Sequence, residues 1–187
     1  MRNNLHAMIL APSVLLSAAL IAALPAQAQD AEVDAPPSVI TFGGPESLSI
    51  ETTGGRHDFT VELAETPEQQ IRGLMYRESL DSNAGILFHY PVPRPTAMHM
   101  ANVAFPLDML FLDDTGEVIK IIAYAQPGSR RVLNADFTVA AVLEIPGGRA
   151  VELEIQPGDR VHHRFFEAIE SAAESDETAP GSEEVPD

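Results

Sequence analysis

Apolar and polar residues alternate along two short segments near the start of the central part of the chain. Residues 48–51 and 59–63 each repeat with a period of two, and residues 53–56 between them include two glycines. This alternation places apolar side chains on one face of an extended strand, and glycine-rich tetrapeptides favour turns. The pattern predicts a β-hairpin with one face exposed to solvent.

The spacing of apolar residues changes directly after this hairpin. Thr66 and Gln69 have the spacing of a capping box, Pro67 stands at the first helical position, and Ile71, Leu74 and Met75 recur at helical intervals. We therefore expect one short amphipathic helix over residues 67–75.

Six further segments fit short strands bounded by Gly, Pro or Asp turns: 85–89, 96–100, 108–112, 118–125, 138–145 and 160–165. Residues 113–116 form the clearest hairpin loop, with Gly116 suited to a left-handed position. Residues 149–155 fit either a strand or a short helix. The sequence predicts a mainly β protein, a compact single-domain β-sandwich or barrel-like fold with one short amphipathic helix.

The first 28 residues differ from the rest of the chain. Arg2 precedes an apolar, alanine-rich run over residues 5–24, and Ala26-Gln27-Ala28 fits a small-x-small cleavage site. The alternative, a transmembrane anchor, is less favoured because Pro12 interrupts the run. Residues 1–28 are therefore predicted to be a signal peptide cleaved after Ala28, which would make the protein periplasmic or secreted, with no stable membrane anchor.

Charge and composition divide the remainder and exclude several classes of function. Residues 29–46 are rich in Ala, Pro and Asp and predict a flexible linker, residues 47–166 form the predicted β domain, and residues 167–187 predict an acidic, disordered tail. The net charge of −17 argues against nucleic acid as a partner. The chain has no cysteine, which excludes disulfides, thiolate metal sites and cysteine nucleophiles.

Asp108 is a candidate site residue because it lies inside an apolar run, where an ionised carboxylate is costly without donors. Arg72 or Arg77, Arg94, Asn102 and nearby backbone amides are candidate partners. In the functional interpretation, Asp108 meets a ligand in a pocket or acts as an acid or base. In the structural one, favoured by the sequence, it belongs to a polar cluster that joins a strand to the helix.

The tripeptide Met98-His99-Met100 suggests copper, because thioethers and imidazole suit Cu(I). In an extended strand the two methionines share one face and His99 points to the other, so all three converge only at a bend. Methionines at alternate strand positions are usually core residues, and the sequence calls for no cofactor.

Known enzymatic motifs are missing from the sequence, including the nucleophile elbow, the HExxH zinc motif and phosphate-binding loops. A dispersed hydrolase site combining Asp108 with Glu144 or Asp136 stays open as an alternative. No residue is assigned a catalytic role, and the sequence favours binding over catalysis.

Ordered motifs across residues 47–166 resemble the DUF192 family, a domain of unknown function. The matching residues are Arg72-Gly73-Leu74-Met75, Arg77, Gly85, Leu87, Phe88, Met100, Asn102, Pro106-Leu107-Asp108, Phe111, Gly116, Val142-Leu143-Glu144, Gly147-Gly148 and 157–161. His99, Ala101 and Val103 replace the Trp, Lys and Thr that are usual in the family. The resemblance implies a compact β-sandwich domain and brings no established reaction.

Three functional hypotheses follow from these features. The first is an exported binding or accessory protein for a small ligand or a protein partner, using Arg72, His99, Asn102 and Asp108. The second is a periplasmic copper-binding protein using Met98, His99 and Met100. The third is a hydrolase using Asp108. The sequence identifies neither the ligand nor the oligomeric state.

Overall fold

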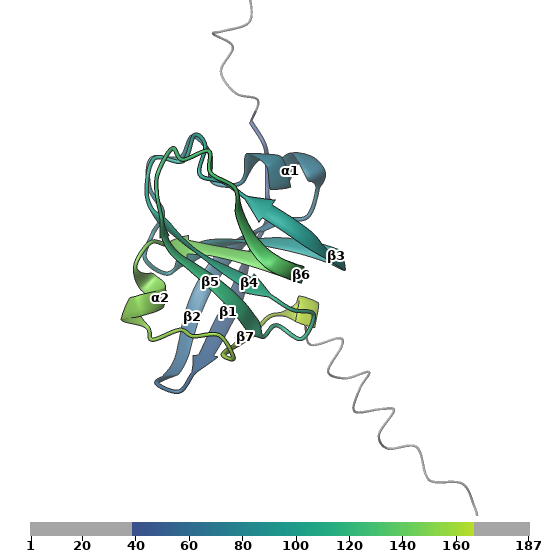
Figure 1. Ribbon diagram of the computed structural model, residues 1–187, viewed down its shortest axis with the longest axis vertical. Helices are drawn as coiled ribbons and strands as arrows, with labels where there is room; N and C mark the ends of the chain where they lie inside the picture. The colour runs from purple at the N-terminus through teal and green to yellow at the C-terminus, as the bar shows by residue number, and fades with distance from the viewer. Residues whose placement is uncertain (1–38, 167–187) are drawn as a thin grey trace, which may run out of the picture. The chain divides into compact units, whose positions relative to one another are not determined.

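A computed structural model of the chain describes residues 39–166 (Figure 1). The predicted signal peptide, residues 29–38 of the predicted linker and the predicted acidic tail lie outside the described residues. None of the helices between residues 39 and 166 has the length and apolar character needed to cross a membrane.

The described residues form one seven-stranded sheet and two short helices. The strands are β1 (Gly43–Thr52), β2 (Gly55–Ala64), β3 (Ala84–Met98), β4 (Leu107–Leu112), β5 (Val118–Ala125), β6 (Leu133–Pro146) and β7 (Arg160–His162), and the helices are α1 (Pro67–Arg72) and α2 (Arg149–Glu152). The sheet order is β5-β4-β6-β3-β2-β1-β7. Only β2 and β3 pair in parallel, and α1 lies on the crossover that this pairing requires.

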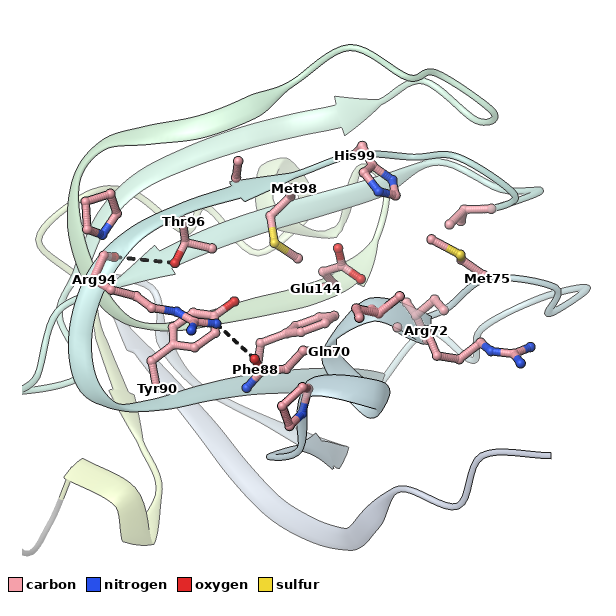
Figure 2. A pocket seen from close by; sticks show the side chains of 17 residues that line it. Gln70, Arg72, Met75, Phe88, Tyr90, Arg94, Thr96, Met98, His99 and Glu144 are labelled. Atoms are coloured by element: carbon pink, nitrogen blue, oxygen red, sulfur yellow. Dashed lines mark hydrogen bonds between the residues drawn. The ribbon is translucent and has the colours of Figure 1, made fainter. Parts of the chain in front are cut away.

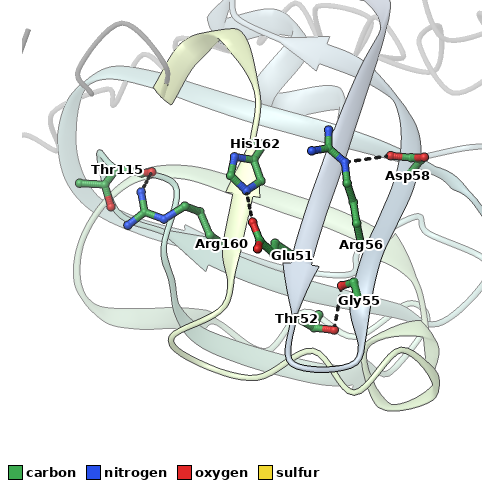
Figure 3. A network of polar contacts seen from close by, with 8 residues as sticks. All are labelled: Glu51, Thr52, Gly55, Arg56, Asp58, Thr115, Arg160 and His162. Carbon is green, nitrogen blue, oxygen red and sulfur yellow. Dashed lines mark hydrogen bonds and ion pairs between the residues drawn. The ribbon is translucent and has the colours of Figure 1, made fainter. Parts of the chain in front are cut away.

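The two edges of the sheet meet at one end of the domain. Glu117 and Arg160 form an isolated antiparallel β-bridge. Beside it, the Val161 N–H donates to the Gly116 carbonyl and the Val118 N–H donates to the Asp159 carbonyl, each at 2.8 Å. The Arg160 guanidinium donates to the Thr115 carbonyl at 3.0 Å (Figure 3). The sheet therefore curls into a partly closed barrel, which confirms the predicted mainly β, barrel-like fold.

Local signals in the sequence placed several elements correctly. Thr52 pairs with Gly55 in the first hairpin, where the Thr52 hydroxyl donates to the Gly55 carbonyl at 3.1 Å (Figure 3). Thr66 and Gln69 form the predicted capping box. Gly116 has a φ of +84°, and a Cβ at this position would lie 2.4 Å from the Val161 carbonyl oxygen, so glycine is required there.

Other element boundaries differ from the prediction. The segments 85–89 and 96–100 belong to one 15-residue strand, β3, which ends at Met98. Helix α1 ends at Arg72 because Gly73, with a φ of +44°, terminates it. Residues 149–152 are helical, giving a second helix, and β7 stops at His162 as the Phe166 N–H bonds back to the His163 carbonyl. β1 begins at Gly43, within the predicted linker.

The central strands carry apolar side chains on both faces, which produces two cores. All six residues of β4 are buried. Leu110 and Leu112 join side chains of β1, β2 and β7 in the first core, which fills the barrel interior. Met109 and Phe111 face outward and pack with Phe88 in the second core. The second core lies on the outer face of the sheet, where α1 and residues 99–106 meet β3.

Candidate functional site

A cavity of about 480 Å³ opens on the outer face of the sheet, beside the second core (Figure 2). Its walls come from α1 and the residues after it, from β3 and from β6. Most of the wall is apolar or aromatic, and Phe88, Met98 and Val103 are among its lining residues. Ligand sites are commonly recesses of this size with a few polar groups on an apolar wall.

Glu144 supplies the buried polar group of this cavity. It stands on β6 in register with Met109 of β4 and Ile86 of β3, so its side chain shares the outward face with Met109. A Cβ on Gly85 would lie 2.8 Å from the Glu144 carbonyl oxygen, so glycine allows β3 to approach β6 closely here. Figure 2 shows the carboxyl group projecting into the space between Met98 and Met75.

The Glu144 carboxyl is almost completely removed from water. The residue is 4% exposed, and within residues 39–166 no other residue hydrogen-bonds to its carboxyl oxygens. Burial raises the pKa of Glu144 to about 8, because desolvation disfavours the charged form. At neutral pH the group is therefore mainly a protonated, uncharged acid that can donate one hydrogen bond.

Arg94 and Tyr90 form a second polar part of the cavity. The Arg94 guanidinium lies 4.3 Å from the centre of the Tyr90 ring and donates to the Gln70 side-chain carbonyl at 2.9 Å. Gln70 is itself fixed, since its amide donates to the backbone carbonyls of Ala64 and His89. Burial is the main cause that raises the pKa of Tyr90. Helix α1 therefore holds Arg94 in place through Gln70.

Asp108 lies on the opposite face of the sheet from Glu144. It is fully buried, and its carboxylate accepts hydrogen bonds from the backbone N–H groups of Tyr124 at 2.7 Å, Gly148 at 3.0 Å and Ala150 at 2.7 Å. Asp108 pairs with Ile145, whereas Met109 pairs with Glu144, so the two acidic side chains point to opposite faces. Asp108 thus joins α2 to β4 and β5.

This placement removes the carboxylate pair on which the hydrolase hypothesis depended. The predicted arginine and asparagine partners of Asp108 are replaced by backbone amides. Asp136, the other candidate, is exposed and pairs with Lys120 at 2.6 Å. Within residues 39–166, neither Glu144 nor Asp136 combines with Asp108 in a shared site.

The other residues predicted for the site are divided between the cavity and the surface. Arg72 and His99 line the cavity. The His99 Nδ1 atom accepts from the Ala101 N–H at 3.3 Å, which leaves Nε2 to carry the proton of the neutral ring. Asn102 does not line the cavity, and its amide donates to the Tyr76 hydroxyl at 3.0 Å. The structure therefore brings two of the four predicted ligand residues together.

The methionine residues are also separated. Met98 lines the cavity, whereas Met100 is fully buried in the second core, because β3 ends at Met98 and the chain turns. Met75 lines the cavity as well, and Figure 2 shows it on the other side of Glu144 from Met98. Among residues 39–166, no three His, Cys, Asp or Glu side chains gather as a metal site.

Sequence reasoning did not place Glu144, Arg94 or Tyr90 among the ligand-binding residues, although all three line the cavity. A signal was present for Glu144, since it interrupts the apolar run of residues 139–145 just as Asp108 interrupts the run in β4. Arg94 was named only as a possible partner of Asp108, because its place at the cavity depends on Gln70 and Tyr90.

Comparisons with known proteins place this fold among uncharacterised ones. Residues 49–163 match the model of the DUF192 family, described as an uncharacterized ACR. A crystal structure from Sinorhizobium meliloti 1021, described as a proposed transcription regulator, is 38% identical, with a TM-score of 0.64 and coverage of 66% of this chain and 97% of that chain. A protein of unknown function from Novosphingobium aromaticivorans DSM 12444 is also 38% identical, with a TM-score of 0.61 and coverage of 63% and 84%. A search of curated proteins found no match.

Proposed function

The chain belongs to the DUF192 family, and from that premise we propose that it is a periplasmic or secreted binding protein that holds a small organic ligand in the cavity beside Glu144. The observation that carries the proposal is the buried Glu144 carboxyl, which faces the cavity with no hydrogen-bond partner among residues 39–166. Buried polar groups are normally paired, so an unpaired one at a cavity is a candidate ligand contact.

The chemistry of the wall supports binding rather than catalysis. Glu144 is the only acidic side chain among the residues that line the cavity, and His99 lies at the wall with one ring nitrogen already engaged by a backbone amide. Thr96 is the only serine, threonine or lysine among the lining residues, and its hydroxyl donates to the Arg94 backbone carbonyl at 3.4 Å. Nucleophile and base therefore do not come together as covalent catalysis needs.

Regulation of transcription, the description given to the relative from Sinorhizobium meliloti, is not the function we propose for this chain. The net charge of −17 opposes binding to phosphate backbones.

A neutral fluorescent dye tests the proposed cavity directly. N-phenyl-1-naphthylamine should bind saturably and gain fluorescence, because it leaves water for an apolar recess. Met98→Trp should abolish this signal, since the larger indole would occupy the cavity. Val92→Trp is the matched control, because Val92 lies on the same strand but is 77% exposed and does not line the cavity.

Equal dye binding by wild type and both tryptophan variants would contradict the proposal. Thermal unfolding of each variant shows whether the fold has survived the substitution. Loss of dye binding in a folded Met98→Trp variant, with binding kept in Val92→Trp, would support the cavity as the binding site.

Copper(I) binding is a second candidate, and one observation favours it: Met75, Met98 and His99 all line the same cavity. Anaerobic calorimetry with Cu(I), compared with Zn(II), tests it. Tight binding that is lost in Met75→Leu and Met98→Leu but kept in Met100→Leu would support a copper site at the cavity. Absence of binding by the wild type would refute it.

A further inference from the structure

The charged groups that line the cavity are mainly basic, which is opposite to the charge of the chain as a whole. The lining residues include Arg72, Arg94 and His99, and Glu144 is the only acidic residue among them. The Arg72 guanidinium points away from Glu144 (Figure 2), so Arg94 supplies the cationic group considered below. Because burial keeps Glu144 largely protonated at neutral pH, the cavity carries net positive charge. The chain itself has a net charge of −17.

Arg94 is the cation best placed to meet a ligand. It is exposed at the cavity, and none of the ion pairs found among residues 39–166 involves it. Its contacts are with uncharged groups, the Gln70 side-chain carbonyl and the Tyr90 ring. These contacts fix the guanidinium without neutralising it, so it can form a charge-assisted bond with an anion.

The remaining wall favours an apolar body over a fully polar one. Ile71 is 74% exposed, and Met75 and Met98 are only partly buried, so apolar side chains that line the cavity still reach water above the tightly packed second core. A small polar anion such as inorganic phosphate would leave this wall uncovered. A ligand with a hydrocarbon portion would remove this apolar wall from water, which is favourable in proportion to the apolar area buried.

We propose that the ligand is an amphipathic organic acid whose anionic group contacts Arg94, whose apolar body covers the wall that includes Ile71 and Met98, and one of whose oxygens accepts from Glu144. This inference rests on the proposed function and names the class of ligand for the same cavity. An organic cation is disfavoured because it would approach the Arg94 guanidinium beside a carboxyl group that burial keeps largely uncharged.

Three eight-carbon probes of different charge test the inference: octanoate, octan-1-ol and octylammonium. Calorimetry at pH 7 should show octanoate binding at least about tenfold more tightly than octylammonium, because one charge-assisted bond is worth more than 1.4 kcal/mol. Arg94→Gln should weaken octanoate binding about tenfold and leave octan-1-ol binding unchanged.

Arg56→Gln is the matched control. Arg56 is an exposed arginine on β2 that pairs with Asp58 at 3.5 Å and does not line the cavity (Figure 3). This variant should bind octanoate as the wild type does. Equal weakening in both variants would show a general charge effect and would overturn the assignment to Arg94.

The pH profile gives a readout that depends on Glu144. The charged and titratable residues that line the cavity with it are Arg72 from α1, Tyr90 and Arg94 from β3, and His99. Octanoate binding by the wild type should weaken as pH rises through about 8, because ionised Glu144 would repel the anion. Glu144→Gln should bind octanoate with no loss over the same range.

Failure of this inference can be separated from failure of the proposed function. If the neutral dye binds but octylammonium matches or exceeds octanoate, or none of the three probes binds, the ligand class is wrong and the binding cavity stands. If the dye fails to bind the wild type, the proposed function is refuted together with the inference.

Discussion

Replacing Glu144 by glutamine should make the protein more stable at neutral pH and remove part of its dependence on pH. Glutamine keeps the shape of the side chain and the ability to donate a hydrogen bond, but it has no charge to lose. The effect is expected in stability, independently of any ligand, because the cause is burial of a carboxyl group that is 4% exposed.

The sign follows from proton binding in the two states. Between the ordinary pKa of 4.5 and the folded pKa of about 8, Glu144 holds a proton in the folded protein and has lost it in the unfolded chain. The unfolded state therefore gains stability relative to the folded one as pH rises, by about 1.4 kcal/mol per pH unit. From pH 5 to pH 7.5 the wild type should lose about 3 kcal/mol relative to Glu144→Gln.

Urea unfolding of both proteins at pH 5, 6, 7 and 7.5 measures this difference. Groups present in both proteins cancel in the comparison, including His89, whose pKa is lowered mainly by burial. Glu68→Gln, which removes an exposed carboxylate of α1, serves as the control and should follow the wild type. Parallel profiles for wild type and Glu144→Gln would refute the reasoning, since they would show that Glu144 ionises alike in both states.

Three further substitutions test the structural assignments by urea unfolding. Asp108→Ala should lower the free energy of unfolding by about 3 kcal/mol, because three backbone N–H groups lose their acceptor, and an unchanged value would show that water replaces it. Gly116→Ala should lower the free energy of unfolding by about 2 kcal/mol or more, because the added Cβ would clash at the barrel closure. Gly128 has a φ of +70° but open space around it, so Gly128→Ala should cost clearly less, and equal losses would contradict the predicted clash. Thr66→Ala should cost about 1 kcal/mol through loss of the cap, and no change would show that α1 is held by packing alone.

Features that depend on neighbours in the sequence were predicted well. The first hairpin, the capping box at Thr66 and the glycine of the 113–116 loop are decided by the conformational preferences of a few consecutive residues. The segments 85–89 and 96–100 were not recognised as one strand, because prolines between them resemble a chain break. Pairing with β6 on both sides of that region keeps β3 continuous.

The candidate site was only partly predictable, because the side chains that line it come from segments far apart in the sequence. Arg72 and His99 were chosen from the sequence and both line the cavity, whereas Asn102 and Asp108 do not. Arg94 was not chosen as a ligand contact, because its position comes from Gln70, which is 24 residues away in the chain.

The sequence by itself determined the first hairpin, the cap of α1, the turn at Gly116, the family and the presence of two acidic residues inside apolar strands, because each of these depends on local order and spacing. Only the tertiary structure decided what those acids do. Pairing of β4 with β6 sets Asp108 toward the interior, where three backbone amides satisfy it, and sets Glu144 outward into a cavity. Side chains alternate between the faces of a sheet, so a difference of one residue in register separates a structural carboxylate from a candidate ligand contact.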